Sequence, residues 1–249
     1  MALIHSFEKS GNKLFRYRGQ IPLILFLLSA PAIYFTDYSC FFESETFRWA
    51  LLITSALFSL LGQVIRAIAI GTSSKHTSGR NTKEQVAEAL NTTGIYSTLR
   101  HPLYLGNYFM WIGIVLYVGN IYFFLVVSLL FWIYYERIMF AEERFLERKF
   151  GESYMTWSLK VPAFIPSFKN YVKNDIPFSL KTILRREYSG ISATIISFVF
   201  VDVLRDYFRN HAFNLTNTQI IILFIALLIS LILRSLKHYT SILSEEDRS

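Results

Sequence analysis

The sequence predicts an all-α, multi-pass transmembrane protein. Of its 249 residues, 53% are hydrophobic and only 17% are charged, which is more apolar than an ordinary soluble domain. Several apolar segments approach the about 20 residues that a helix needs to cross a bilayer. We expect six spans, at residues 20–35, 47–70, 103–118, 121–138, 191–203 (extending toward residue 207) and 218–233.

The basic residues predict how these spans are oriented. If the N-terminus is inside, only Arg48, Arg205 and Arg209 of the 25 Lys and Arg fall outside, which leaves 22 on one face. Cytoplasmic loops of membrane proteins carry such an excess. We therefore expect both termini and the long loops 71–101 and 139–189 in the cytoplasm. The net charge of +7 is then explained mainly by membrane topology. It therefore no longer supports nucleic-acid binding, which a basic excess could otherwise indicate.

Cysteine and histidine usage narrows the class further. Cys40 is the single cysteine, so no intrachain disulfide forms, and the five histidines lie far apart in the chain. No cluster has metal-ligand spacing, so we expect no metal site. The first apolar run lacks a small-residue cleavage site, and we interpret it as a retained transmembrane helix rather than a signal peptide.

The residues that open the third span form a candidate site. Pro102 suits the first turn of a helix, which places Arg100 and His101 at the helix mouth with exposed backbone donors nearby. His101 and Tyr104 are three residues apart and share a face, while Gly106 permits close approach of another backbone or a ligand. The pattern indicates a polar pocket at the membrane surface.

A tight hairpin should bring acidic residues to this pocket. Only Gly119 and Asn120 separate the third and fourth spans, so the chain returns to the face that it left. Glu142 and Glu143, just past the fourth span, must then lie near His101. Beyond them, a segment rich in aromatic residues and prolines could fold back as a lid or serve as an interfacial anchor.

An ordered set of motifs runs from residue 94 to residue 166, about a third of the chain. The motifs are Arg100-His101-Pro102-x-Tyr104-x-Gly106, Glu142-Glu143-x-x-Leu146, Phe150-Gly151-x-x-Tyr154, Val161-Pro162 and Ile165-Pro166. This set resembles the isoprenylcysteine carboxyl methyltransferase and phospholipid methyltransferase superfamily. The polar stretch 76–83 is similar to a subset of bacterial members.

The resemblance implies an integral membrane enzyme that binds S-adenosylmethionine in a pocket closed by cytoplasmic loops, with a lipid substrate entering from the bilayer. We expect a methyltransferase core at 1–174, with four spans and the cofactor segment 94–166. The two-span hairpin at 175–249 is additional to the family pattern. The sequence lacks a Gly-x-Gly-x-x-Gly signature, so the soluble Rossmann-type methyltransferase fold is not an alternative. Carried over by position, the cofactor-binding residues are Tyr96, Arg100, His101, Tyr104, Gly106, Asn107, Glu142, Glu143, Ile165 and Pro166.

The methyl acceptor stays open at this point. An anionic oxygen acceptor needs cations to hold it, and Arg80, Arg137 and Arg144 are the candidates. An amine acceptor would need a carboxylate base, Glu142 or Glu143. With Arg137 and Arg144, these carboxylates form the predicted catalytic set.

The abundance of arginine favours an anionic head group, such as a phosphate of a lipid A type glycolipid. Alternatives are a phospholipid amine, a prenylcysteine-type carboxylate, or a membrane transporter or scaffold without enzymatic activity. We expect the protein in the cytoplasmic membrane of a bacterium.

Overall fold

The computed structural model describes residues 2–73 and 85–245, and these residues form helices without any strand. The predicted all-α fold is therefore confirmed for this part of the chain. The elements are α1 (Leu3–Tyr17), α2 (Ile21–Tyr34), α3 (Ser39–Glu43), α4 (Glu45–Gly71), the 3-10 turn η1 (Gly94–Ser97), α5 (Pro102–Tyr117), α6 (Ile121–Phe150), α7 (Glu152–Ser158), α8 (Leu180–Asn210) and α9 (Asn217–Tyr239).

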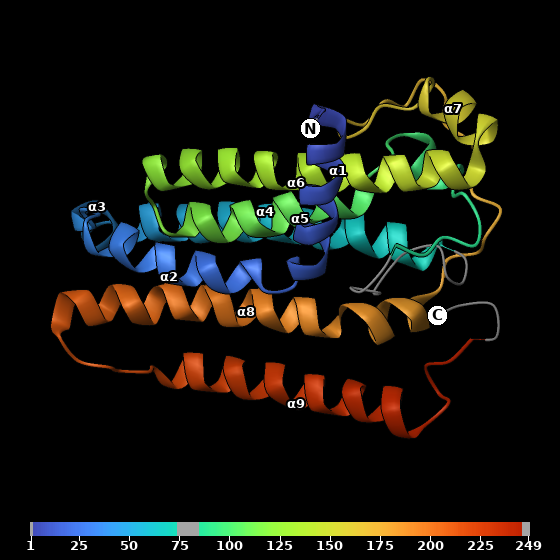
Figure 1. The fold of residues 1–249 in the computed structure, drawn as a ribbon. Coiled ribbons are helices and arrows are strands. Elements are labelled where there is room, and N and C mark those ends of the chain that lie inside the picture. The colour runs from blue at the N-terminus through green and yellow to red at the C-terminus, as the bar shows by residue number, and fades with distance from the viewer. Residues whose placement is uncertain (1, 74–84, 246–249) are drawn as a thin grey trace.

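The long helices run side by side, and α1 crosses them at a steep angle (Figure 1). Helix α4 packs against α5 and α8, and α9 lies on the outer side of α8. Helix α1 packs on α6, where a Cβ at Gly11 would lie 2.0 Å from the backbone oxygen of Arg137. The two helices can approach so closely because Gly11 has no side chain.

Four helices, α4, α6, α8 and α9, are long and apolar enough to cross a membrane within the described residues. The six spans expected from the sequence are not all present at that length, because α2 has 14 residues and α5 has 16. Both shorter helices coincide with the expected apolar runs within one residue at each end, so the apolar runs themselves are shorter than the about 20 residues of a full span.

The hairpin between α5 and α6 forms as predicted. Gly119 has φ +76°, a left-handed conformation that glycine adopts without steric cost. The Asn120 side chain then accepts a hydrogen bond from the backbone N–H of Phe123 and caps α6. Helix α6 continues without a break to Phe150, where Gly151 ends it with φ +52°. The second half of α6 therefore runs past the start of α5.

Small residues allow α4 and α5 to pack at close range. A Cβ at Gly113 would lie 2.2 Å from the Ser59 hydroxyl, and one at Gly62 would lie 2.4 Å from the backbone oxygen of Gly106. Such small-residue contacts are typical of helix pairs in membranes, where packing rather than hydrophobicity holds helices together. Close packing here sets Arg66, one turn beyond Gly62, against Gly106.

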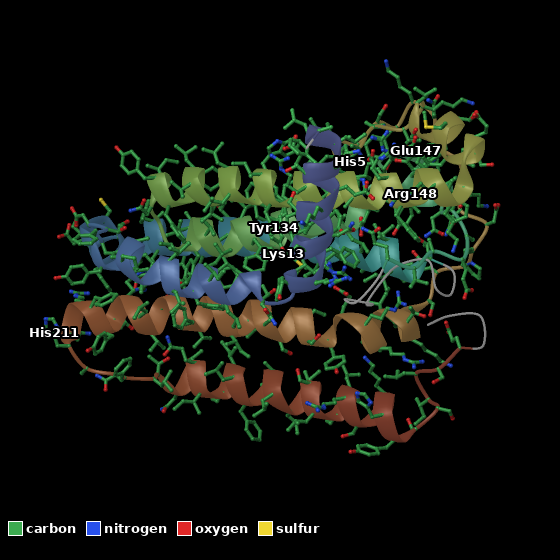
Figure 2. The ribbon with its side chains drawn as sticks, in the orientation of Figure 1. His5, Lys13, Tyr134, Glu147, Arg148 and His211 are labelled. Atoms are coloured by element: carbon green, nitrogen blue, oxygen red, sulfur yellow. The ribbon has the colours of Figure 1, made fainter. Side chains whose placement is uncertain are left out.

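A buried arginine of α8 links this helix to the end of α5. Arg205 is 1% exposed, forms an ion pair with Asp202 at 3.2 Å and donates to the backbone oxygen of Tyr117 at the end of α5. Its guanidinium also lies 3.9 Å from the ring centroid of Phe41. The turn that follows α8 carries His211, which lies at the opposite end of the bundle from Glu147 and Arg148 (Figure 2).

We predict that Arg205→Met destabilises the protein by about 3 kcal/mol, because it leaves the Asp202 carboxylate and the α5 terminus without their cation. Arg209→Met is the matched control, since Arg209 is exposed and stacks on the Phe42 ring; it should cost less than about 1 kcal/mol. Unfolding by titration with sodium dodecyl sulfate in mixed micelles measures both. Equal losses in the two variants would contradict this account.

Candidate active site

The chain between η1 and α5 is shaped by backbone contacts to a distant segment. Gly94 has φ +59°, and its N–H donates to the backbone oxygen of Val172 at 2.9 Å. Pro102 occupies the first turn of α5, as predicted. The backbone N–H groups of Arg100 and His101 donate to the backbone oxygens of Pro162 and Ala163, at 2.9 and 3.1 Å respectively. These two backbone donors are therefore occupied by the chain itself.

Two carboxylates from α6 meet the start of α5. Arg100 forms a two-pronged ion pair with Glu143, with nitrogen–oxygen distances of 2.8 and 3.2 Å. His101 Nε2 lies 2.9 Å from Glu143 Oε1, and its Nδ1 lies 3.6 Å from Glu142 Oε2. The Tyr104 hydroxyl donates to Glu142 Oε1 at 2.7 Å. The predicted meeting of these residues across the hairpin is present in the structure.

The two carboxylates determine the protonation of His101. The ring is 6% exposed, and this burial alone would lower its pKa, but the hydrogen bonds and charges of Glu142 and Glu143 outweigh burial and raise the pKa of His101 above its ordinary value. Burial also raises the pKa of Tyr96 to about 12. The two carboxylates thus favour the protonated form of His101, and burial favours the neutral phenol of Tyr96.

The proline-rich segment after α7 lies against this group of residues. Arg100 Nη1 donates to the backbone oxygens of Ser158 at 2.7 Å and Val161 at 3.0 Å. The N–H of Ser167 donates to the backbone oxygen of Thr98 at 2.9 Å. The Ile165 side chain, a predicted cofactor contact, is 77% exposed.

A second group of polar contacts, around Arg66, adjoins the residues that surround His101. Arg66 of α4 forms an ion pair with Glu187 of α8 through two contacts of 2.7 Å, and it also donates to Asn107. Asn107 in turn donates to the Tyr135 hydroxyl at 3.1 Å. The ring of Tyr135 lies 4.8 Å, centroid to centroid, from that of Tyr104. The network thus joins α4, α5, α6 and α8.

Sequence reasoning missed Arg66, Glu187 and Tyr135 as members of the site. A signal existed for Arg66, because it falls inside the expected span 47–70, and an ionisable residue within a span is by default a functional candidate. Gly106, a predicted cofactor residue, packs directly on Arg66. A Cβ at this position would lie 2.5 Å from the Arg66 side chain, which explains why the residue is glycine.

The predicted substrate arginines lie apart from the carboxylates. The guanidinium of Arg137 stacks on the Phe7 ring of α1 at 3.2 Å, and Arg144 pairs with Glu147 on its own helix. Arg80 lies outside the described residues. Of the predicted cofactor residues, the structure therefore brings Arg100, Tyr104, Glu142 and Glu143 together around His101. It places the two described arginines on other faces of α6.

The comparisons with known proteins agree with the motif resemblance. Residues 50–153 match the family model described as phospholipid methyltransferase. Curated proteins named protein-S-isoprenylcysteine O-methyltransferase are 36% identical in Schizosaccharomyces pombe (48% of this chain, 52% of that protein), 31% in Saccharomyces cerevisiae (46% and 48%) and 29% in Homo sapiens (54% and 47%).

Through this segment the chain is similar to the phospholipid methyltransferase family and to these isoprenylcysteine O-methyltransferases. The predicted resemblance is thereby confirmed. The chain spans about half the length of the curated relatives it matches. No solved structure matches it with significance. The family match ends before α8, so Glu187 completes the polar network from outside the matched segment.

We predict strong energetic coupling between Arg66 and Glu187. Arg66→Met or Glu187→Leu alone leaves an uncompensated charge in a buried environment and should each lower the free energy of unfolding by about 3 kcal/mol. The double variant should be more stable than either single variant, because both charges are gone. A double-mutant cycle by chemical unfolding in micelles measures the coupling, and additive losses would show that the pair acts independently.

We also predict a pH-dependent contribution from His101. Its pKa is higher in the folded protein than the about 6.5 of an unfolded chain. The protonated ring therefore stabilises the fold below that pH, and the stabilisation is lost as the pH rises through the folded-state pKa. The stability advantage of the wild type over His101→Gln should shrink as the pH rises above about 6.5 and through the higher folded-state pKa. An advantage that is constant or grows with pH would contradict the cationic state.

Proposed function

We propose that the protein is an S-adenosylmethionine-dependent methyltransferase that modifies a lipid or lipid-anchored acceptor at the cytoplasmic membrane face. The observation that carries the proposal is the carboxylate pair Glu142 and Glu143, held by Arg100, His101 and Tyr104 at the mouth of α5. The similarity to this family supports the same reaction class.

The residues present suit this cofactor. S-adenosylmethionine, when bound, supplies a methyl group on a positively charged sulfur, together with an ammonium group. Glu142 accepts the Tyr104 hydroxyl with one oxygen and leaves the other 3.6 Å from the nearest His101 nitrogen. That second oxygen can hold a cationic group of the cofactor. Tyr96 and the backbone around Pro166 are further contacts that the family resemblance implies.

The side chains of the site have different tasks in this proposal. Glu143 is already bonded to Arg100 and His101, so we assign it to positioning rather than to direct cofactor contact. Glu142 binds and orients the cofactor. Methyl transfer is an in-line displacement, which depends on alignment and on exclusion of water. The segment after α7, fastened to Arg100 by two hydrogen bonds, excludes water on the cytoplasmic side.

An anionic oxygen is the acceptor that we favour. The relatives are named O-methyltransferases, and an ionised oxygen nucleophile needs no general base. A lipid phosphate such as that of lipid A and a prenylcysteine-type carboxylate both meet this requirement. For a phospholipid amine, Glu142 would have to accept a proton.

We further infer that α2 and α5 cross the membrane as short spans, which gives six in all with both termini in the cytoplasm. The 16 residues of α5 rise about 24 Å. A bilayer of about 30 Å can accommodate such a helix by local thinning and snorkelling. This topology places Glu142, Glu143 and His101 at the cytoplasmic surface, in the cytoplasmic membrane if the source is bacterial.

We predict that the purified protein binds S-adenosylmethionine and that His101→Ala and Glu142→Gln each weaken binding at least about tenfold, because each removes a charged partner from the site. Glu147→Gln is the matched control, since Glu147 pairs with Arg144 one turn further along α6, and it should bind normally. Isothermal titration calorimetry in detergent measures all four proteins. The proposal fails if the wild type shows no binding.

A further inference from the structure

The segment that follows α7, residues 159–169, runs back along α6. Helix α7 begins directly after α6 ends at Phe150. The Phe164 ring nevertheless packs edge-on against Trp132 of α6, with ring centroids 5.5 Å apart. The part of α6 between Trp132 and Phe150 rises about 27 Å. The segment therefore returns over most of the length of α6, and Figure 1 shows the chain running from α7 back toward α1.

This return takes the segment past the polar boundary of α6. The first charged residue of α6 is Glu136, and Trp132 lies about 6 Å further into the apolar part of the helix. That helix is long and apolar enough to cross a membrane. The Phe164 ring also lies near Tyr108 of α5, with ring centroids 6.4 Å apart, and Tyr108 is about 9 Å along the helix from Pro102. Both neighbours therefore place Phe164 at bilayer depth rather than in the cytoplasm.

The backbone of the segment is suited to this depth. Irregular backbone is tolerated in a bilayer only where its polar groups are bonded to protein or reach water. Pro162 and Pro166 have no N–H group that would need a partner. The carbonyl oxygens of Pro162 and Ala163 are occupied by the two N–H groups at the mouth of α5. These features reduce the number of polar groups that the lipid would have to accommodate.

The side chains of the segment are distributed as in a loop that enters a membrane. Ile165 and Phe168 are large and apolar, and they are 77% and 75% exposed. Lys160 and Lys169, on either side of them, are exposed as well, and residues 159–169 contain no Asp or Glu. Apolar side chains of this kind enter the boundary between head groups and acyl chains, while neighbouring lysines reach the lipid phosphates.

We propose that residues 159–169 form a re-entrant loop that inserts into the bilayer beside α6, with its apolar side chains in the acyl-chain boundary and its two lysines at the lipid phosphates. The partner of this surface is the bilayer itself. Because the loop also bonds the backbone of Arg100 and His101, the membrane stabilises the position of these two residues. The insertion does not depend on the methyltransferase assignment, and only its consequence for the cofactor rests on the proposed function.

Fluorescence quenching by labelled lipids tests the insertion. In a Cys40→Ser background, which removes the single native cysteine, the full chain with Ile165→Cys carries a nitrobenzoxadiazole fluorophore in nanodiscs of phosphatidylcholine and phosphatidylglycerol. The control label is at Glu152→Cys, an exposed position at the start of α7. Lipids with a doxyl group near the top of the acyl chain should quench the Ile165 label at least about threefold more strongly than the control label. Equal lipid quenching at the two positions, or stronger quenching of the Ile165 label by aqueous iodide, would overturn the proposal.

Hydrogen exchange tests the consequence for the candidate active site without any cofactor. Ile165→Asp places a charge on the loop, which is costly in a bilayer, and should accelerate amide exchange at residues 98–101 about tenfold in the same nanodiscs. The matched control Met155→Asp changes an apolar side chain of α7 that is 39% exposed and should leave this exchange unchanged. Equal exchange in the two variants would overturn the stabilising role of the membrane. Cofactor binding is measured separately by calorimetry, so a failed loop insertion and a failed methyltransferase assignment give different results.

Discussion

The ion pair between Arg100 and Glu143 is the constraint on which the site depends. It joins the start of α5 to the far end of α6, and the same carboxylate holds His101. Arg100 also binds two backbone oxygens after α7, so one side chain fixes three segments. The two side chains are only 17% and 26% exposed, and removal of one partner would leave a partly buried charge without compensation. The geometry around Glu142 follows from this anchoring.

The C-terminal helices take part in this arrangement to different degrees. Helix α8 contacts α2, α4 and α5, whereas α9 packs on α8. Glu187 holds Arg66 beside Gly106 at one end of α8, and Arg205 holds the end of α5 at the other. The division into a core at 1–174 and an added hairpin stays a prediction. The polar contacts of α8 nevertheless make its conformation relevant to the site.

The sequence was sufficient where local chemistry determines the structure. A turn at Gly119, a proline at the start of α5 and two helices of known rise place Glu142 near His101 without any further information. It was insufficient for the number of spans of full length, because an apolar run as short as α5 does not by itself decide whether a helix crosses the bilayer. It also missed the contact between Arg66 and Glu187, which are separated by 121 positions. The packing of α1 on α6 was likewise not expected. The basic residues of α1 indicated only on which side of the membrane the N-terminus lies.

The central claim is that the carboxylate site transfers a methyl group to a membrane lipid. The most direct measurement is a label-transfer assay, in which protein in nanodiscs made from a total lipid extract is incubated with methyl-labelled S-adenosylmethionine. The lipid fraction is then analysed by mass spectrometry. The account predicts label in an anionic lipid that gains one methyl group on oxygen. Absence of label from every lipid, with protein that is folded and inserted, would contradict it.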